Sequence, residues 1–335
     1  MSDFRTISGF RVQSLASDPS PVQEGQIWYN TTSNVLKVEI LETITTNAWA
    51  SGGNMNTARF ALAGAGSQTS ALAFGGSTTP PLTRLASTEK YDGTNWTSVN
   101  SMNTARNELA GAGTQTAALA FGGLVPAATA ATEKYDGTNW TTVNSMNTAR
   151  ESLAGAGTQT SALAFGGSPP TVVKPTATEK YDGTNWTSVN NMNSGRGGLS
   201  GCGTQTAALA SGGIPVGVST ATEKYDGTNW TTVNSMNTAR QQSGAAGTQT
   251  SALLFGGRTG PATIHTATEL YNGTTWTSNP TELATARWGI AGCGTQTSAL
   301  ASGGSTGYPG TPASSATEEW TGSFTQLAAK TITTS

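Results

Sequence analysis

Short alternating or apolar stretches, each followed by a turn signal, run through most of this chain. In residues 106–150, "ELAGAGTQT" alternates small and larger residues before a turn, and "AALAFGG" is an apolar run that ends at two glycines. "ATEKYDG" alternates and ends in Asp-Gly, a strong hairpin signal, and "NWTTVNSM" carries the Trp, Thr and Val that favour strands. The segment therefore predicts four short antiparallel strands joined by tight turns.

This four-strand pattern recurs six times along the chain. "ATEKYDGTNWTTVNSMNTAR" occupies 131–150 and returns letter for letter at 221–240. Each unit begins at an arginine, and successive arginines are 44 to 47 residues apart. Four-stranded units of this length are typical of propeller blades. In a ring of equivalent units each position meets the same neighbours, so one sequence can serve several times.

Two charged positions and one aromatic position recur with the units. Buried charges need partners, so the charged positions predict structural ion pairs rather than six catalytic acids. The tryptophans, with Phe324 in that role in the sixth unit, are expected on outer strands, where they fill the gap between neighbouring sheets. The arginines are Arg59, Arg106, Arg150, Arg196, Arg240 and Arg287; the glutamates are Glu89, Glu133, Glu179, Glu223, Glu269 and Glu318; the tryptophans are Trp96, Trp140, Trp186, Trp230 and Trp276.

An arginine, an apolar strand that ends in Gly-Gly, a Tyr-Asp and a Trp five residues later together resemble the Kelch repeat. The resemblance covers roughly residues 50–327. It implies a closed ring of four-stranded blades, and six units imply six. The Asp-box of sialidase-type propellers is the rival, but "YDGTNW" lacks the Ser before Asp and the Gly two residues after it. We therefore expect an all-β, six-bladed Kelch-like β-propeller at 46–335, after a small N-terminal β-hairpin anchor segment at 1–45.

The spacing of the first tryptophan indicates how the ring closes. Trp49 precedes Arg59 by ten residues, as the tryptophan does at four later junctions, and "NMNTAR" at 54–59 matches the linker. The spacing predicts that the segment around Trp49 forms the last strand of the sixth unit. In the alternative layout, 323–329 completes that unit and 1–50 is a detached anchor.

The segment between Gly-Gly and "ATE" changes in length and content from unit to unit, whereas "GTQT" and "DGTN" barely change. In four-stranded antiparallel blades these loops share one face, and the invariant turns lie on the other. Varied loops on a rigid scaffold are usual places for binding. Relaxed drift on an unused surface is the alternative. The candidate ligand-binding residues in these loops are Arg84, Lys174, Arg258, His265 and Tyr308.

Composition excludes several classes of function. Only 11% of residues are charged and the net charge is −2, without a Lys/Arg cluster, so a nucleic-acid partner lacks its electrostatic footprint. No apolar run is long enough to insert in a membrane. His265 is the single histidine, so a His-rich metal site is excluded and an acid/base constellation is missing. We expect no enzyme activity, no metal and no cofactor.

The first fifty residues contain "GQIWYN", "TTSN" and "VLKVEI", which predict a strand, a turn and a strand. This hairpin resembles a segment near the start of bacteriophage virion proteins, including tail-fibre proteins. The N-terminus lacks the layout of a signal peptide, which fits a particle protein released by lysis. The resemblance implies a location on the virion.

These observations favour a non-enzymatic phage appendage or surface protein. Its N-terminal segment would contact other virion proteins, and its variable loops would bind a host-surface glycan or protein. The alternative is a structural decoration or adaptor protein whose loops contact other virion subunits. A glycan-active enzyme is a third interpretation, disfavoured by the missing acid/base residues. Homo-oligomerisation is left open.

Overall fold

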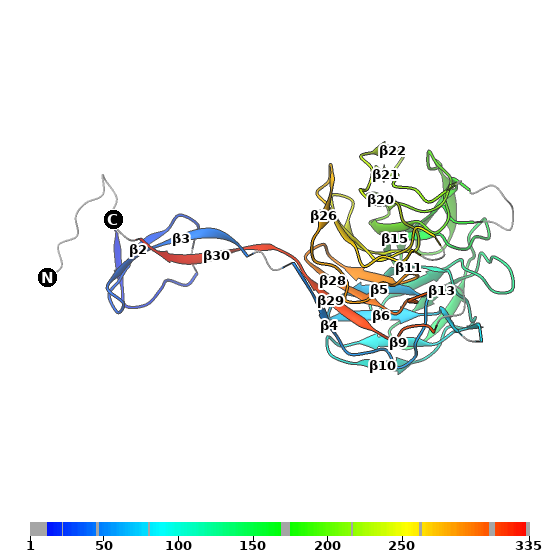
Figure 1. Cartoon of the computed structure of the whole chain (residues 1–335), viewed down its shortest axis with the longest axis horizontal. Coiled ribbons are helices and arrows are strands. Elements are labelled where there is room, and N and C mark those ends of the chain that lie inside the picture. The colour runs from blue at the N-terminus through cyan, green and yellow to red at the C-terminus, as the bar shows by residue number, and fades with distance from the viewer. Residues whose placement is uncertain are drawn as a thin grey trace. The chain divides into compact units, whose positions relative to one another are not determined.

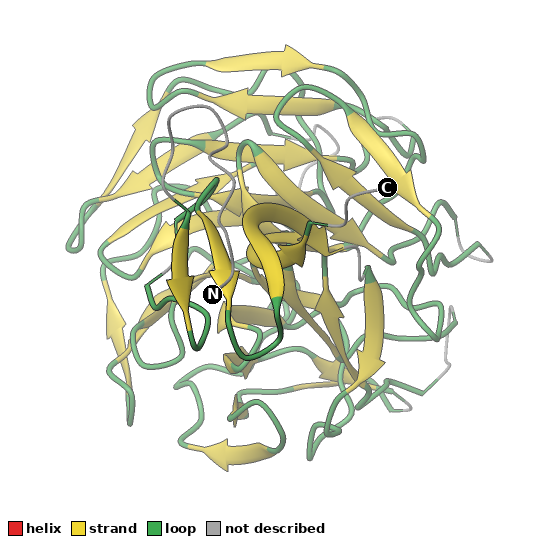
Figure 2. Cartoon of the chain, turned by 90° about the vertical axis from the view of Figure 1, so that its left-hand side faces the viewer, coloured by secondary structure: helices red, strands yellow, loops and turns green. Residues whose placement is uncertain are grey.

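The computed structural model describes residues 12–21, 23–44, 47–79, 81–168, 175–215, 217–260, 263–307 and 312–332. The regular structure in these ranges is all β-strand (Figures 1 and 2). Within these ranges, no helix is long and apolar enough to cross a membrane. The chain divides into a larger unit, Asn47–Thr321, and a smaller unit formed by Met1–Thr46 and Gly322–Ser335.

The larger unit contains six four-stranded antiparallel sheets among its described residues. The first strands are β5 (Ala63–Ser67), β11 (Ala110–Gly113), β15 (Ala154–Thr158), β19 (Ser200–Gly203), β23 (Gly244–Thr248) and β27 (Ala291–Gly294). The second strands are β6 (Ser70–Phe74), β12 (Ala118–Phe121), β16 (Ser161–Phe165), β20 (Ala208–Ser211), β24 (Ser251–Phe255) and β28 (Ser298–Ser302).

The third strands are β9 (Thr88–Tyr91), β13 (Thr132–Tyr135), β17 (Thr178–Tyr181), β21 (Thr222–Tyr225), β25 (Thr268–Tyr271) and β29 (Thr317–Thr321). The fourth are β10 (Trp96–Val99), β14 (Trp140–Val143), β18 (Trp186–Val189), β22 (Trp230–Val233), β26 (Trp276–Asn279) and, in the last sheet, β4 (Ala48–Ser51). A short ladder of β7 (Ser77–Thr78) and β8 (Thr83–Arg84) lies in the first variable loop.

Small residues on the first strands allow these strands to crowd together. A Cβ atom added at Gly111 would lie 2.8 Å from the Phe74 ring and 2.9 Å from the Gly64 carbonyl oxygen, both in the preceding sheet. Contacts this short do not occur for real side chains, so the position requires glycine. The small residues of the "AGAG" sequence are therefore explained by the close approach of neighbouring first strands.

Aromatic side chains fill the space between successive sheets, as the sequence predicts. Phe74 and Trp140 come from adjacent sheets, and their ring centroids are 5.0 Å apart. The Trp140 indole nitrogen donates to Thr88 Oγ1 of the preceding sheet at 3.0 Å. This indole-to-threonine bond is repeated at every junction, with Trp96, Trp186, Trp230, Trp276 and Trp49 as the other donors.

The last sheet is completed by the strand around Trp49, as the tryptophan spacing predicts. Trp49 on β4 lies opposite Trp320 on β29, and its indole nitrogen donates to Thr268 of the preceding sheet. Phe324 does not take the tryptophan role in the sixth unit. It begins β30 (Phe324–Thr331), which pairs with β3 (Val35–Ile44) in the smaller unit.

The smaller unit is a four-stranded sheet in the order β1 (Gln13–Leu15), β2 (Ile27–Asn30), β3 and β30. The predicted hairpin is present, since β2 and β3 pair antiparallel around residues 31–34. The sequence assigned all of 46–335 to the propeller. The structure instead assigns the stretch after Thr321 to the smaller unit, because β30 pairs with β3 over eight residues. The smaller unit is thus a sheet drawn from both ends of the chain rather than a hairpin alone.

Candidate functional site

Each repeat arginine lies in a buried polar cluster that supports the surrounding loops. Arg150 Nη2 is 2.9 Å from Glu179 Oε1, and Arg150 Nη1 donates to the carbonyl oxygens of Gly166 and Ala177. The second Glu179 oxygen accepts the Asn147 N–H of the preceding linker. Burial lowers the pKa of Arg150, and the Glu179 charge opposes that shift.

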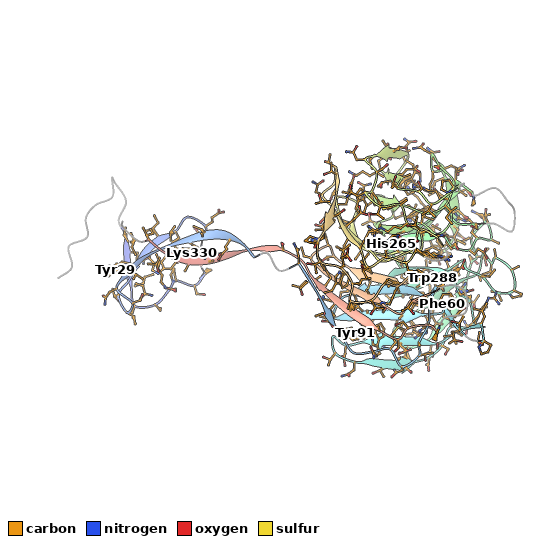
Figure 3. All side chains as sticks on the ribbon, viewed as in Figure 1. Tyr29, Phe60, Tyr91, His265, Trp288 and Lys330 are labelled. Carbon is orange, nitrogen blue, oxygen red and sulfur yellow. The ribbon has the colours of Figure 1, made fainter. Side chains whose placement is uncertain are left out.

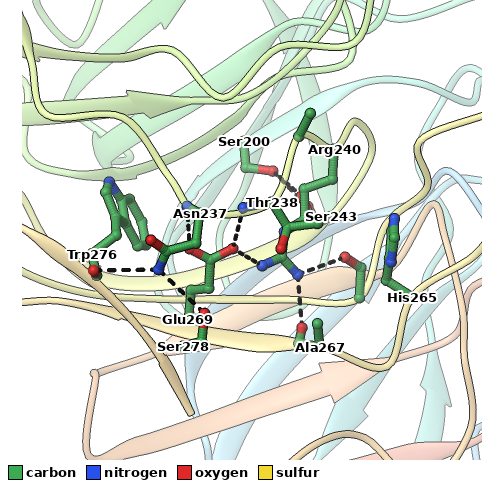
Figure 4. A network of polar contacts seen from close by, with 12 residues as sticks. Ser200, Asn237, Thr238, Arg240, Ser243, His265, Ala267, Glu269, Trp276 and Ser278 are labelled. Carbon is green, nitrogen blue, oxygen red and sulfur yellow. Dashed lines mark hydrogen bonds and ion pairs between the residues drawn. The ribbon is translucent and has the colours of Figure 1, made fainter.

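The sequence predicted an arginine–glutamate pair in each unit, and all six are present. Figure 4 shows the pair in the fifth sheet, where Arg240 and Glu269 meet between Asn237 and Ala267. The clusters are structural, because both side chains of each pair are buried and the pair is bonded to other strands and linkers through the Nη and carboxylate atoms, while each Nε is buried without a partner.

The variable loops and the linkers between sheets lie at the same end of the sheets, because strand directions alternate. The "GTQT" turns lie at the opposite end, and their glutamine explains why they do not vary. Gln159 Nε2 donates to the carbonyl oxygens of Ala118 and Tyr135 in the preceding sheet. The same pair of bonds recurs for Gln68, Gln115, Gln205, Gln249 and Gln296. The glutamines of these turns are therefore needed to hold neighbouring sheets together.

At the loop end, a cycle of backbone hydrogen bonds runs through all six units. The second residue after each repeat arginine donates its N–H to the carbonyl of its equivalent in the preceding unit, at 2.7–2.8 Å. The six members are Ala61, Glu108, Ser152, Gly198, Gln242 and Gly289, and Ala61 donates to Gly289. All six have positive φ, including four that are not glycine. Such backbone is strained for residues with a Cβ and often marks functional sites.

This cycle surrounds the mouth of a cavity of about 150 Å³ that is lined by four consecutive residues from each unit. Most lining residues are Gly, Ala, Leu or Ile. The polar ones are Glu108, Ser152, Ser200, Gln242 and Ser243, and Glu108 is the single charged residue among them. We call this cavity and its rim the channel mouth.

The polar side chains of the channel mouth hold one another in place. Ser152 Oγ donates to Glu108 Oε2, and Arg258 Nε donates to Gln242 Oε1 at 3.1 Å. Ser200 Oγ donates to the Ser243 carbonyl oxygen at 2.8 Å (Figure 4). The site thus presents a carboxylate, an amide and hydroxyl groups on an otherwise apolar wall.

The channel-mouth residues were not among those singled out from the sequence, although a signal exists. The two residues after each arginine differ in every unit, between the nearly invariant "NTAR" and "LAGAG" wording. These pairs are Phe60-Ala61, Asn107-Glu108, Glu151-Ser152, Gly197-Gly198, Gln241-Gln242 and Trp288-Gly289. Residues that vary within an otherwise constant repeat are not required for folding of the sheets.

Three of the five loop candidates lie in described residues, and each has partners within the protein. Arg84 Nε donates to Asn107 Oδ1 at 3.2 Å. The Arg258 guanidinium lies 4.2 Å from the centre of the Trp288 ring. His265 Nε2 bonds with Thr259 Oγ1, and burial followed by the charge of Arg240 lowers the pKa of His265. Lys174 and Tyr308 lie outside the described residues.

Arg258 is the loop candidate that reaches the channel mouth, through Gln242. Beside it, Trp288 packs against Phe60 with ring centroids 5.1 Å apart, and both rings are buried (Figure 3). The first and last units are thus joined at this face by an aromatic pair with Arg258 stacked upon it. Arg84 bonds instead to Asn107, the residue before Glu108.

No family model and no curated protein matches this sequence. Among solved structures, one titled "Structure of YjhT" matches 83% of this chain and 99% of its own, with a TM-score of 0.65 and 13% identity. That neighbour is a Kelch-type propeller. At this identity the likeness shows the fold alone. Together with the repeated four-stranded sheets, it shows that this chain has an all-β, propeller-like fold.

Proposed function

We propose that the six sheets form a closed six-bladed Kelch-like propeller, and that the chain is a non-enzymatic appendage or surface protein of a bacteriophage particle. Its loop face binds a host-surface glycan or protein, and its smaller unit contacts other virion proteins. The virion assignment is supported by the resemblance of the N-terminal hairpin, together with the Thr-, Ser-, Asn- and Gly-rich composition.

One observation carries the binding function. Among six nearly identical units, differences gather in the loops after Gly-Gly and in the pairs after the arginines, which share one end of the sheets. The turns at the opposite end have nearly the same sequence in every unit, because their glutamines bond to the neighbouring sheet. A scaffold that varies at one end alone is typical of a binding face.

The test is adsorption of the fluorescently labelled full chain to host cells and to a panel of surface glycans. Arg258→Ala should weaken adsorption without unfolding the protein. Thr116→Ala, an exposed position in a "GTQT" turn, is the matched control and should adsorb normally. Loss of adsorption from the turn variant alone would show that the wrong face has been chosen.

The alternative is a decoration or adaptor protein whose loops contact other virion subunits. It predicts that the full chain binds particles lacking it and does not bind host cells, and that Arg258→Ala weakens particle binding. Turnover of a host polysaccharide would instead support a glycan-active enzyme.

A further inference from the structure

We propose that the channel mouth takes a protonated primary amine, held by the Glu108 carboxylate. This inference rests on the proposed binding function of the loop face and names the chemistry of its ligand. The amine could be carried by an amino sugar or by a lysine side chain. Both present a cation on a short carbon frame.

Charge is the first argument. Glu108 is the single charged residue that lines the cavity. Ser152 bonds to its Oε2 atom, and within the described part of the chain no other hydrogen bond reaches this carboxylate. A partly enclosed carboxylate is costly unless it is paired with a cation. The neighbouring basic residues are occupied elsewhere, since Arg106 pairs with Glu133 and Arg84 bonds to Asn107.

The Gln242 amide supplies a second, complementary group. In the cycle of six, Gln242 is three steps from Glu108 in either direction, so the two side chains approach from opposite sides of the mouth. Arg258 Nε donates to Gln242 Oε1 and thereby fixes the amide with its NH₂ group as the remaining donor. No described residue accepts from that NH₂ group. The site therefore offers an acceptor for an ammonium on one side and a donor for an oxygen on the other.

Size and wall composition limit the ligand. Cavities of about 150 Å³ are known to hold a ring of six heavy atoms. Gly198 and Gly289 flank Gln242 in the cycle and add no side chain to the rim there. The apolar side chains of the wall suit methylene or sugar-ring carbons, whereas one carboxylate and a few hydroxyl groups suit one cation. An anionic sugar would meet Glu108 without a free cation to balance it.

The test is isothermal titration of the full chain at about pH 6, where carboxylates and amines are both charged. Two matched probe pairs are D-glucosamine against N-acetyl-D-glucosamine, and Nα-acetyl-lysine amide against its Nε-acetylated form. The free amine should bind at least about tenfold more tightly than its acetylated partner, because a charge-assisted bond is lost on acetylation. The pair that shows this difference identifies the source of the amine.

Glu108→Gln should abolish that preference, because the amide keeps the shape and the bond from Ser152 but not the charge. Glu282→Gln, at an exposed carboxylate of the same face, is the control and should bind like the wild type. Equal binding of both members of both pairs, or failure of every amine to bind, would overturn the proposal. The wild-type comparison remains decisive if Glu108→Gln does not fold. Host-cell adsorption that is lost in Arg258→Ala but retained in Glu108→Gln would leave the binding face standing and reject the amine.

Discussion

At the scale of single residues, buried charge explains why arginine and glutamate recur in a chain with few charges. The Arg150 and Glu179 side chains are 0% and 1% exposed, and their backbone hydrogen bonds go to both ends of the loop between β16 and β17 and to the preceding linker. Each pair therefore joins a loop to a linker. A neutral residue on one side would leave the other charge buried without a partner.

Arg150→Ala should lower the free energy of unfolding by about 3–5 kcal/mol, because Glu179 would lose its counter-charge inside the protein. Urea denaturation measures this change. Arg84→Ala, on a partly exposed loop, is the control and should shift stability by no more than about 1 kcal/mol. An unchanged midpoint for Arg150→Ala would contradict the structural role of the pairs.

The left-handed positions of the channel mouth offer a second test at this scale. Gly198 has φ +66°, and a Cβ added there would meet its neighbours at ordinary contact distances of 3.4 Å or more. Gly198→Ala should therefore cost about 1–2 kcal/mol from backbone strain alone. Gly217→Ala is matched, because that glycine has open space around it and no positive φ. Thermal melting of both variants should separate them; equal melting temperatures would show that the cycle is not strained.

At the scale of elements, the loop before β2 is tied to the small sheet through one carboxylate. Asp18 accepts hydrogen bonds from Trp28 Nε1, Asn30 Nδ2 and Lys37 Nζ. The hydrogen bond from Lys37, and to a smaller extent the one from Asn30, stabilises the charged carboxylate and lowers the pKa of Asp18 below its usual 3.8. Trp28 is fully buried beneath this loop.

A lowered carboxyl pKa gives a defined pH dependence. The Asp18 contribution to stability should be present above pH 3.8 and be lost as the pH falls through the lower, folded-state value. The fluorescence of Trp28, isolated by difference against Trp28→Phe, should report this acid transition. Asp18→Asn should remove it, since the amide does not titrate. A transition that persists in Asp18→Asn would assign it to another carboxyl group.

At the scale of the whole molecule, the last sheet of the larger unit is completed by a strand that precedes the first repeat. β4 pairs with β29, the Gly52 N–H donates to the Thr317 carbonyl, and Trp49 contacts Phe255 and Trp320. The last sheet therefore contains residues more than 260 positions apart in the chain. The ends of the repeat array are joined without the segment after Thr321.

Deletion of 1–52 should destabilise the larger unit by about 3 kcal/mol, because the contacts of the partly buried Trp49 and the β4 hydrogen bonds are lost together. Deletion of 1–46 is the matched control, because it removes part of the smaller unit and keeps β4. Removal of 322–335 should likewise leave the larger unit folded. Calorimetry would contradict this closure if the 1–46 and 1–52 deletions melted together while removal of 322–335 unfolded the protein.

The sequence by itself determined the strand order within each unit, the ion pairs, the aromatic positions other than Phe324, and the strand that completes the last sheet. These features repeat at a fixed spacing, and the turns that set them are local. The pairing of β30 with β3 could not be predicted, because a single long-range register has no repeat to reveal it. The same limit applies to the channel mouth. Glu108 and Gln242 are 134 residues apart in the sequence, and only the cycle of six units brings them to one rim.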